Sequence, residues 1–440
     1  MSHKPAHETD LRAQDTPAVG IPDQDPSVTG SARTRLNISW AISLFGTAVG
    51  AGILFLPINA GAGGPWPLLL VTLLIWPMTY LSHRALSRFV CVSPRKGEDI
   101  TVVAGDYFGK AWGMAITLLY FLAIYPIVLI YGVGITNTVD SFIVNQLGGP
   151  ELPRPLLAIV LIGLMMLVMV FGEKVMLRTA AILVYPLILL LLILSIYLIP
   201  QWDLSVFTES RPSVGAFFMS AWLIIPVLVF AFNHSPAISQ FSLAMQRAYG
   251  RDAVQEASKT LRLTATLLVV FTMFFVWSCV LALGADGLAE AREQNLPVLS
   301  YIANVTNTPL VAWLAPLIAI AAIGSSFFGH YLGTAEGASG IVRQVLPGVA
   351  NRLGTKGITI AVAAFIYITS VIVAIINPSI LGVIESLGGP VIAAILYIMP
   401  IVAIYTVPAL EKYRHRWFTN AFVVIMGLVA IGGIFFTFIR

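Results

Sequence analysis

Three glycines interrupt an apolar, membrane-length segment at residues 38–59, and their spacing suits the binding of a charged ligand. Gly46, Gly50 and Gly52 fall within seven residues, and glycine favours local unwinding of a helix. Unwound backbone exposes N–H and C=O groups, which a membrane tolerates only where they line a cavity within protein. Such broken helices form substrate sites at mid-membrane depth. The alternative interpretation is a close-packing seam between two helices.

A second interruption lies in the apolar segment 213–246, at the sequence Ala231-Phe-Asn-His-Ser-Pro236. Proline lacks an N–H donor and clashes with the preceding turn, and it moves Ser235 away from helical angles. Asn233, His234 and Ser235 therefore lie beside broken backbone at membrane depth, where polar groups usually face a cavity. For Asn233 and His234, the alternative is a hydrogen bond between helices.

The two breaks together supply the groups that a zwitterionic amino acid requires. Helix N-termini present free N–H groups and partial positive charge to a carboxylate, whereas unwound carbonyls suit an ammonium group or Na⁺. We expect the first break to hold the carboxylate, and the second to hold the amino group and side chain. The residues predicted to bind substrate are Thr47, Val49, Gly50, Ala51, Gly52, Phe230, Ala231, Asn233, His234 and Ser235. Their polar side chains favour a small hydroxylated substrate.

Four polar residues in later apolar segments are candidates for ion coupling. Ser325 and Ser326 either offer hydroxyl oxygens to Na⁺ held against the first break or bond back to the carbonyl four residues earlier. His330 either carries a coupling proton or is a neutral histidine that fixes two helices. Glu385 is the second proton candidate, because an unpaired carboxylate in a membrane is costly, and its alternative is a structural hydrogen bond.

Small residues also recur in the segment 309–334 and just beyond it. Gly329, Gly333 and Gly337 are spaced four residues apart, which predicts a helix face smooth enough for close contact with other helices. Glu336 lies near the predicted cytoplasmic end of the same stretch, and we interpret it as a solvated carboxylate.

Composition places the chain among membrane proteins that cross the bilayer many times. Hydrophobic residues make up 58% of the sequence and charged residues only 10%, whereas soluble domains have about 25% charged residues. The net charge of +4 comes from basic residues spread over loops, so it indicates membrane topology and no nucleic-acid partner. Residues 1–36 are polar and are expected to form a disordered cytoplasmic tail without a signal peptide.

Hydropathy predicts eleven spanning helices within a transporter domain at 37–440. They lie at about 38–59, 66–88, 111–140, 154–172, 177–200, 213–246, 260–284, 309–334, 357–377, 379–406 and 417–439. Of the 25 Lys and Arg residues, 21 fall on one side, so the N-terminus is predicted to be cytoplasmic and the C-terminus external. Breaks in the first and sixth spans indicate two inverted five-helix repeats, about 37–200 and 213–406, followed by an extra helix at about 417–439.

Three stretches resemble bacterial serine/threonine permeases of the hydroxy/aromatic amino acid permease family, within the amino acid–polyamine–organocation superfamily. They are Ser39–Pro57, Phe232–Pro236 and Gly324–Thr334, and the resemblance extends over about residues 34–440. It implies an all-α integral membrane protein with a LeuT-type 5+5 inverted repeat, and uptake of L-serine or threonine, usually coupled to protons. It also implies substrate contacts at both breaks. Ser325 and Ser326 match the ion ligands of sodium-coupled relatives, so Na⁺ remains an alternative coupling ion.

These observations favour a symporter of the bacterial inner membrane that works by alternating access. A channel would show a repeated filter element or a continuous polar stripe, and the sequence has neither. An enzyme is not expected, because the spans contain no metalloprotease motif, Walker A lysine or paired carboxylates. No cofactor is expected besides the coupling ion. An amino acid sensor that has lost transport is a further alternative, and the sequence leaves the oligomeric state open.

Overall fold

The protein is described by a computed structural model that covers residues 30–171, 173–209, 211–305, 308–384 and 388–439. Regular secondary structure in these ranges is helical. The longer helices are α1 (Gly30–Ala48), α2 (Ala51–Ala62), α3 (Pro65–Cys91), α4 (Ile100–Ser141), α5 (Arg154–Val170), α6 (Glu173–Leu198), α8 (Val214–Ala231), α9 (Ser235–Tyr249), α10 (Ala253–Glu293), α12 (Pro309–Val345), α13 (Pro347–Ile376) and α17 (Trp417–Ile439).

Short helical pieces connect the longer helices and subdivide the predicted span 379–406. They are η1 (Phe142–Gln146), η2 (Ile199–Gln201), α7 (Val206–Glu209), η3 (Gly250–Asp252), α11 (Val298–Val305), α14 (Ile380–Val383), α15 (Gly389–Ala393), η5 (Ala394–Ile398), α16 (Met399–Thr406) and η6 (Pro408–Tyr413). Within that span, residues 385–387 are outside the described part of the chain, so the predicted site residue Glu385 is not placed.

Helix is present in all eleven predicted segments. Among the described residues, eight helical stretches are long and apolar enough to cross a membrane, and α1 with α2 makes a ninth if that bent pair is one span. The apolar parts of α5 and α17 are shorter. The protein is therefore a helical, multi-pass membrane protein, and eleven crossings stay a prediction.

The helix α1 begins earlier than the predicted boundary of the polar tail. It starts at Gly30, so residues 30–36 are helical, and residues 1–29 lie outside the described ranges. The extra turns are held by α9, because the Tyr249 hydroxyl contacts Arg33 O at 3.0 Å and Asn37 Oδ1 at 2.8 Å. The predicted tail boundary at residue 36 was therefore too late.

Three long helices change direction at a glycine with a positive φ angle. These are Gly109 (79°) in α4, Gly284 (65°) in α10 and Gly354 (60°) in α13. The left-handed region is open to glycine at little cost, so the chain turns there and continues as a second helical segment. Each glycine lies within three residues of a predicted span end, which explains why the helices are longer than the predicted spans.

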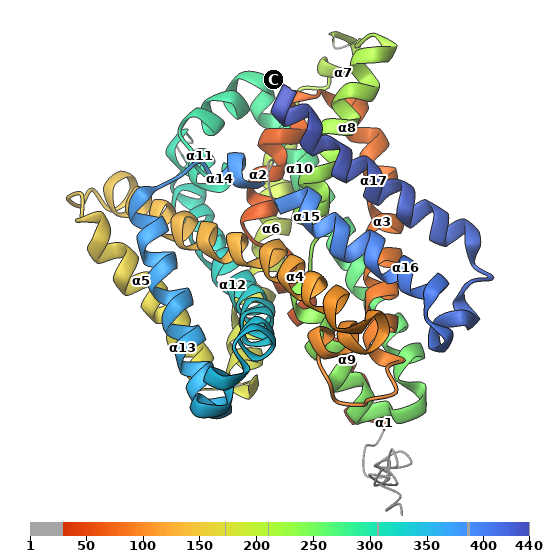
Figure 1. The fold of residues 1–440 in the computed structure, drawn as a ribbon. Coiled ribbons are helices and arrows are strands. Elements are labelled where there is room, and N and C mark those ends of the chain that lie inside the picture. The colour runs from red at the N-terminus through yellow and green to blue at the C-terminus, as the bar shows by residue number, and fades with distance from the viewer. Residues whose placement is uncertain (1–29, 172, 210, 306–307, 385–387, 440) are drawn as a thin grey trace, which may run out of the picture.

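The central helix for the candidate site is α12, which packs against α1, α4, α6 and α9. Figure 1 shows that α1 begins at the lower end of the helical bundle, whereas α17 ends at its upper end. Both of the predicted breaks are present, between α1 and α2 and between α8 and α9.

Candidate functional site

The first break consists of Val49 and Gly50, where α1 and α2 meet at an angle of 52°. The Gly50 N–H turns back to Ala48 O at 2.9 Å, and Gly50 O then accepts from Ile53 N at 3.2 Å and Leu54 N at 3.3 Å, which starts α2. The regular helical ladder is therefore interrupted at the position that the glycine spacing predicted.

Close packing requires glycine at position 50. A Cβ there would lie only 2.5 Å from Ser326 Cβ and 2.8 Å from Tyr131 Oη, closer than side chains can approach. The break thus brings the start of α2 directly against α12 and α4. Tyr131 was not among the predicted site residues, because nothing in its apolar segment marks it as a partner of Gly50.

Ser326 ties the end of α1 to α12 and α4. Its hydroxyl donates to Thr47 O, and because a serine hydroxyl has one hydrogen, Tyr131 must be the donor in its 2.7 Å contact with Ser326 Oγ. All three residues are buried. Thr47 O lies in the last turn of α1, where carbonyls lack a helical partner. Ser326 therefore supplies the hydrogen bond that the break denies to this carbonyl.

Ser325 behaves differently from its neighbour. Its hydroxyl donates to Ala322 O within α12 at 3.2 Å. This is a local bond like the predicted alternative to ion binding, but its acceptor is three residues earlier instead of four. Of the two serines, Ser326 is the one that faces the first break. A sodium ligand at either serine stays a prediction.

The second break consists of residues 232–234, between α8 and α9. Asn233 Oδ1 accepts from Ser235 N at 3.0 Å, which satisfies the first N–H of α9. His234 Nδ1 donates to Phe232 O at 3.1 Å. Both side chains are therefore oriented by the unwound backbone itself.

His83 on α3 also contacts this break and was missed by sequence reasoning. Its ring stacks on that of His234, with centroids 3.5 Å apart and planes 8° from parallel. His83 Nδ1 donates to Thr79 O at 2.8 Å, and Nε2 accepts from the His234 backbone N–H at 3.1 Å. Because one nitrogen donates and the other accepts, the ring is neutral. The only signal in the sequence was a histidine inside an apolar segment.

Two polar atoms at the second break are buried without a hydrogen-bond partner among the described residues. They are Asn233 Nδ2, a donor, and His234 Nε2, which is an acceptor because Nδ1 carries the ring hydrogen. An unsatisfied buried polar group costs about 1–3 kcal/mol, so adjacent unsatisfied groups in a folded protein require an explanation. A ligand that bonds to both atoms would remove this cost.

The structure brings the two breaks together. A Cβ on Gly52 would lie 2.6 Å from Phe230 Cδ1 and 2.8 Å from Ala231 Cα, so the first turn of α2 packs on the end of α8. Ala51 is the first residue of α2. Most of the residues predicted to bind substrate are buried. They are Thr47, Val49, Gly50, Gly52, Phe230, Ala231, Asn233, His234 and Ser235.

The glycine face of α12 packs closely, as predicted. A Cβ at Gly329 would be 2.8 Å from Thr47 Cβ, one at Gly333 would be 2.9 Å from Pro236 Cβ, and one at Gly337 would be 3.1 Å from Phe121 Cβ. The three glycines therefore contact α1, α9 and α4, in that order. Because Thr47 lies at the end of α1 and Pro236 at the start of α9, α12 touches both breaks.

We expect Gly329→Ala to destabilise the protein, because the new methyl group would press on Thr47 at the end of α1. Overpacking of this kind costs about 1–3 kcal/mol and should lower the thermal unfolding temperature of the purified protein in detergent. Gly105→Ala is the matched control, since a Cβ there meets nothing within 4 Å. Equal unfolding temperatures for the two variants would contradict close packing at Gly329.

His330 lies one turn after Ser326 and is buried. Its Nδ1 donates to Ser326 O at 2.9 Å, and the Tyr131 ring meets it edge-on with centroids 5.2 Å apart. His330 therefore belongs to the cluster around the first break. Its role as a proton carrier stays a prediction.

Glu336 is not the freely solvated carboxylate that its position suggested. It is partly buried, and it accepts hydrogen bonds from Tyr120 on α4 and from Ser239 and Gln240 on α9. The interpretation was wrong because position along α12 does not reveal that α4 and α9 cover this end of the helix.

Comparisons with known proteins identify relatives over most of the chain. Residues 36–439 match the model of the tryptophan/tyrosine permease family. Serine transporter SdaC of Escherichia coli K12 is 49% identical over 413 residues, covering 92% of this chain and 96% of that protein. Threonine/serine transporter TdcC of Escherichia fergusonii is 38% identical over 435 residues, covering 93% and 98%.

A solved structure has the same overall fold. The crystal structure of MhsT in complex with L-phenylalanine matches with a TM-score of 0.57 and 17% sequence identity, covering 89% of this chain and 98% of that one. At this identity the match concerns the fold alone, which is LeuT-like.

Proposed function

The chain belongs to the tryptophan/tyrosine permease family, and on that premise we propose that it imports L-serine, with L-threonine as a second substrate, in symport with protons. The relatives named as serine and threonine/serine transporters support amino acid transport by this chain. We place it in the bacterial inner membrane with a cytoplasmic N-terminus, an external C-terminus and eleven spans.

The observation that carries the proposal is the pair of unsatisfied polar atoms at the second break. Asn233 Nδ2 offers a hydrogen and His234 Nε2 offers a lone pair. A hydroxyl group both donates and accepts. The side chain of serine or threonine can therefore form a hydrogen bond with each of the two atoms, whereas an aliphatic side chain can form none. This chemistry favours a hydroxylated substrate.

The remaining groups of the substrate fit the backbone of the two breaks. The first N–H groups of α2, starting at Ala51, have no helical partner and carry partial positive charge, which suits the substrate carboxylate. Carbonyls at the end of α8, from Phe230 and Ala231, suit its ammonium group. Because Gly52 packs on Phe230, one small amino acid can reach both breaks.

In the proposal, transport depends on a substrate that binds between the two broken helices and stabilises one arrangement of them. In the proposed cycle, substrate and proton enter from outside, bind at both breaks and favour an occluded state. The two inverted repeats, 37–200 and 213–406, then rearrange so that the site opens to the cytoplasm. Strict coupling requires that the carrier loaded with only one of the two rarely changes orientation.

The test is uptake of radiolabelled L-serine into proteoliposomes with a pH gradient or a Na⁺ gradient imposed separately. We expect accumulation with the pH gradient, abolished by a protonophore, and stronger competition by L-threonine than by L-alanine or L-phenylalanine. Accumulation with Na⁺ alone would replace H⁺ by Na⁺ as the coupling ion and favour Ser326 Oγ and Thr47 O as its ligands. Serine binding without transport would identify a sensor and overturn the proposal.

A further inference from the structure

The Glu336 carboxylate joins α12 to α4 and α9 through uncharged donors. It accepts from Tyr120 Oη at 3.2 Å, from Ser239 Oγ at 2.8 Å and from Gln240 Nε2 at 3.3 Å. In the part of the chain that the structure describes, no lysine, arginine or histidine forms an ion pair with it. Carboxylates within membrane segments are rare, and they mark ion and proton pathways when they are not paired with a cation.

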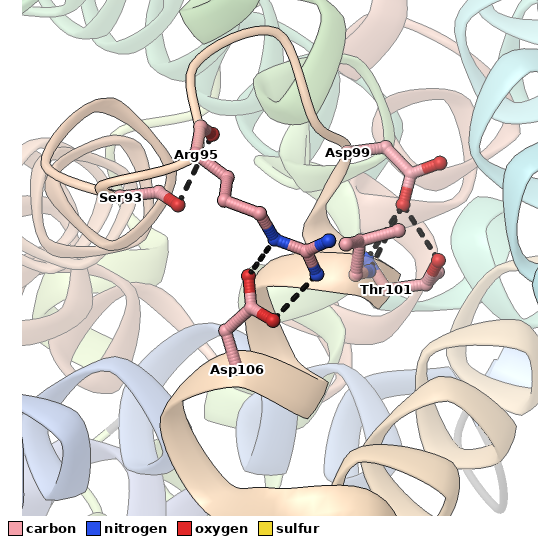
Figure 2. Close-up of polar contacts among 6 residues, drawn as sticks. Ser93, Arg95, Asp99, Thr101 and Asp106 are labelled. Carbon is pink, nitrogen blue, oxygen red and sulfur yellow. Dashed lines mark hydrogen bonds and ion pairs between the residues drawn. The ribbon is translucent and has the colours of Figure 1, made fainter. Parts of the chain in front are cut away.

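The groups around Glu336 are fixed in place from the N-terminal end of α4. Ser239 Oγ accepts from the Ile100 N–H at 3.1 Å, so its own hydrogen is directed to Glu336. Figure 2 shows how the start of α4 is held: Asp99 accepts from Thr101 N at 2.9 Å, and Arg95 Nε donates to Asp106 Oδ2 at 2.7 Å. The Ser239 donor is therefore preorganised.

Among the described residues, two titratable groups act on this carboxylate, one on α4 and one at its N-cap. Tyr120 contacts it directly, and the charge of Asp99 also acts on it. The other element packed against it, α9, contributes Ser239 and Gln240, which do not titrate. A change in the charge of Glu336 consequently acts most directly on the Tyr120 hydroxyl, which contacts the carboxylate.

The Tyr120 hydroxyl can satisfy Glu336 in either charge state. It lies 3.2 Å from Glu336 Oε2 and 3.4 Å from Pro236 O, but it has only one hydrogen. When Glu336 is ionised, that hydrogen goes to Oε2. When Glu336 is protonated, its O–H donates to Tyr120 Oη and the tyrosine hydrogen turns to Pro236 O. Neither state leaves a buried polar group without a partner.

We propose that Glu336 carries the coupling proton and that Tyr120 is the positioning residue that links its charge to the second break at Pro236. Pro236 is in the first turn of α9, next to Asn233 and His234, so the hydrogen bond that Tyr120 makes there changes with the charge of Glu336. In the cycle, an O–H bond forms at Glu336 Oε2 with a proton from external water, and the same proton leaves to cytoplasmic water. This inference rests on the proposed serine–proton symport.

The experiment measures proton uptake on serine binding and serine transport in the same set of variants. Calorimetry in buffers of different ionisation enthalpy should give uptake of about one proton per L-serine for the parent protein and none for Glu336→Gln. Glu336→Gln should also lose accumulation driven by a pH gradient but keep serine–serine exchange, which shows that it is folded. Tyr120→Phe should shift the midpoint of the pH profile of uptake by about one unit.

Glu290→Gln is the matched control, because Glu290 accepts from Tyr301 Oη at 2.7 Å in the same kind of tyrosine–carboxylate pair, away from both breaks. It should behave as the parent does. Unchanged proton uptake and pH-driven accumulation in Glu336→Gln would overturn the inference while leaving serine symport intact. Accumulation of serine by the parent with Na⁺ alone would also overturn it. Failure of the parent to accumulate serine under any gradient would instead reject the proposed function.

Discussion

Replacing Ser326 with alanine is expected to reduce L-serine uptake by about tenfold or more. The variant loses the donor to Thr47 O and the acceptor for the Tyr131 hydroxyl, so two buried polar groups lose their partner at the first break. Each such group costs about 1–3 kcal/mol, and about 1.4 kcal/mol corresponds to a factor of ten. The end of α1 would no longer be tied to α12 and α4 by hydrogen bonds.

Ser325→Ala is the control for this prediction, because Ser325 bonds only to Ala322 O within its own helix. Local bonds of this kind add little to helix stability, so uptake should stay within about twofold of the parent. Initial rates in proteoliposomes, normalised to folded protein by size-exclusion chromatography, provide the measurement. In a double-mutant cycle, Ser326→Ala and Tyr131→Phe should be less than additive. Equal rates for the two serine variants would refute the role assigned to Ser326.

The positions of both breaks could be predicted because their causes are local. Glycine and proline act on the backbone of their own turn, and the structure interrupts its helices at Val49–Gly50 and at residues 232–234. The ends of the predicted spans could be placed for the same reason, because a glycine there lets the helix change direction. The predicted end of one span at 284 coincides with the glycine at which α10 turns.

The partners of the breaks could not be predicted, because they come from helices distant in sequence. His83 stacks on His234, and Tyr131 bonds to Ser326, yet each lies alone in an apolar segment. Hydropathy measures the polarity of a segment and not the direction of one side chain. Ser325 and Ser326 illustrate this, since adjacent helical residues point about 100° apart and only Ser326 faces the first break.

The ability to distinguish L-serine from L-alanine is expected to depend on the two unsatisfied atoms at the second break. Asn233→Asp keeps the oxygen that caps Ser235 N but replaces the Nδ2 donor with an acceptor. His234→Phe keeps a ring against His83 but removes Nε2. A site built to bond a hydroxyl rejects the analogue that lacks it. In both variants the preference for L-serine over L-alanine should therefore fall at least about tenfold, which corresponds to about 1.4 kcal/mol.

The measurement is the ratio of the inhibition constants of L-alanine and L-serine against radiolabelled serine uptake. A ratio is informative because general damage to the carrier weakens both ligands and leaves their ratio unchanged. Thr138→Val is the matched control, since Thr138 Oγ1 on α4 is also buried without a partner among the described residues but lies outside both breaks. If Thr138→Val changes the ratio as much as Asn233→Asp and His234→Phe do, then unsatisfied polar atoms do not mark the substrate site. If only the two break variants change it, the hydroxyl of the substrate is bound at the interruption between α8 and α9.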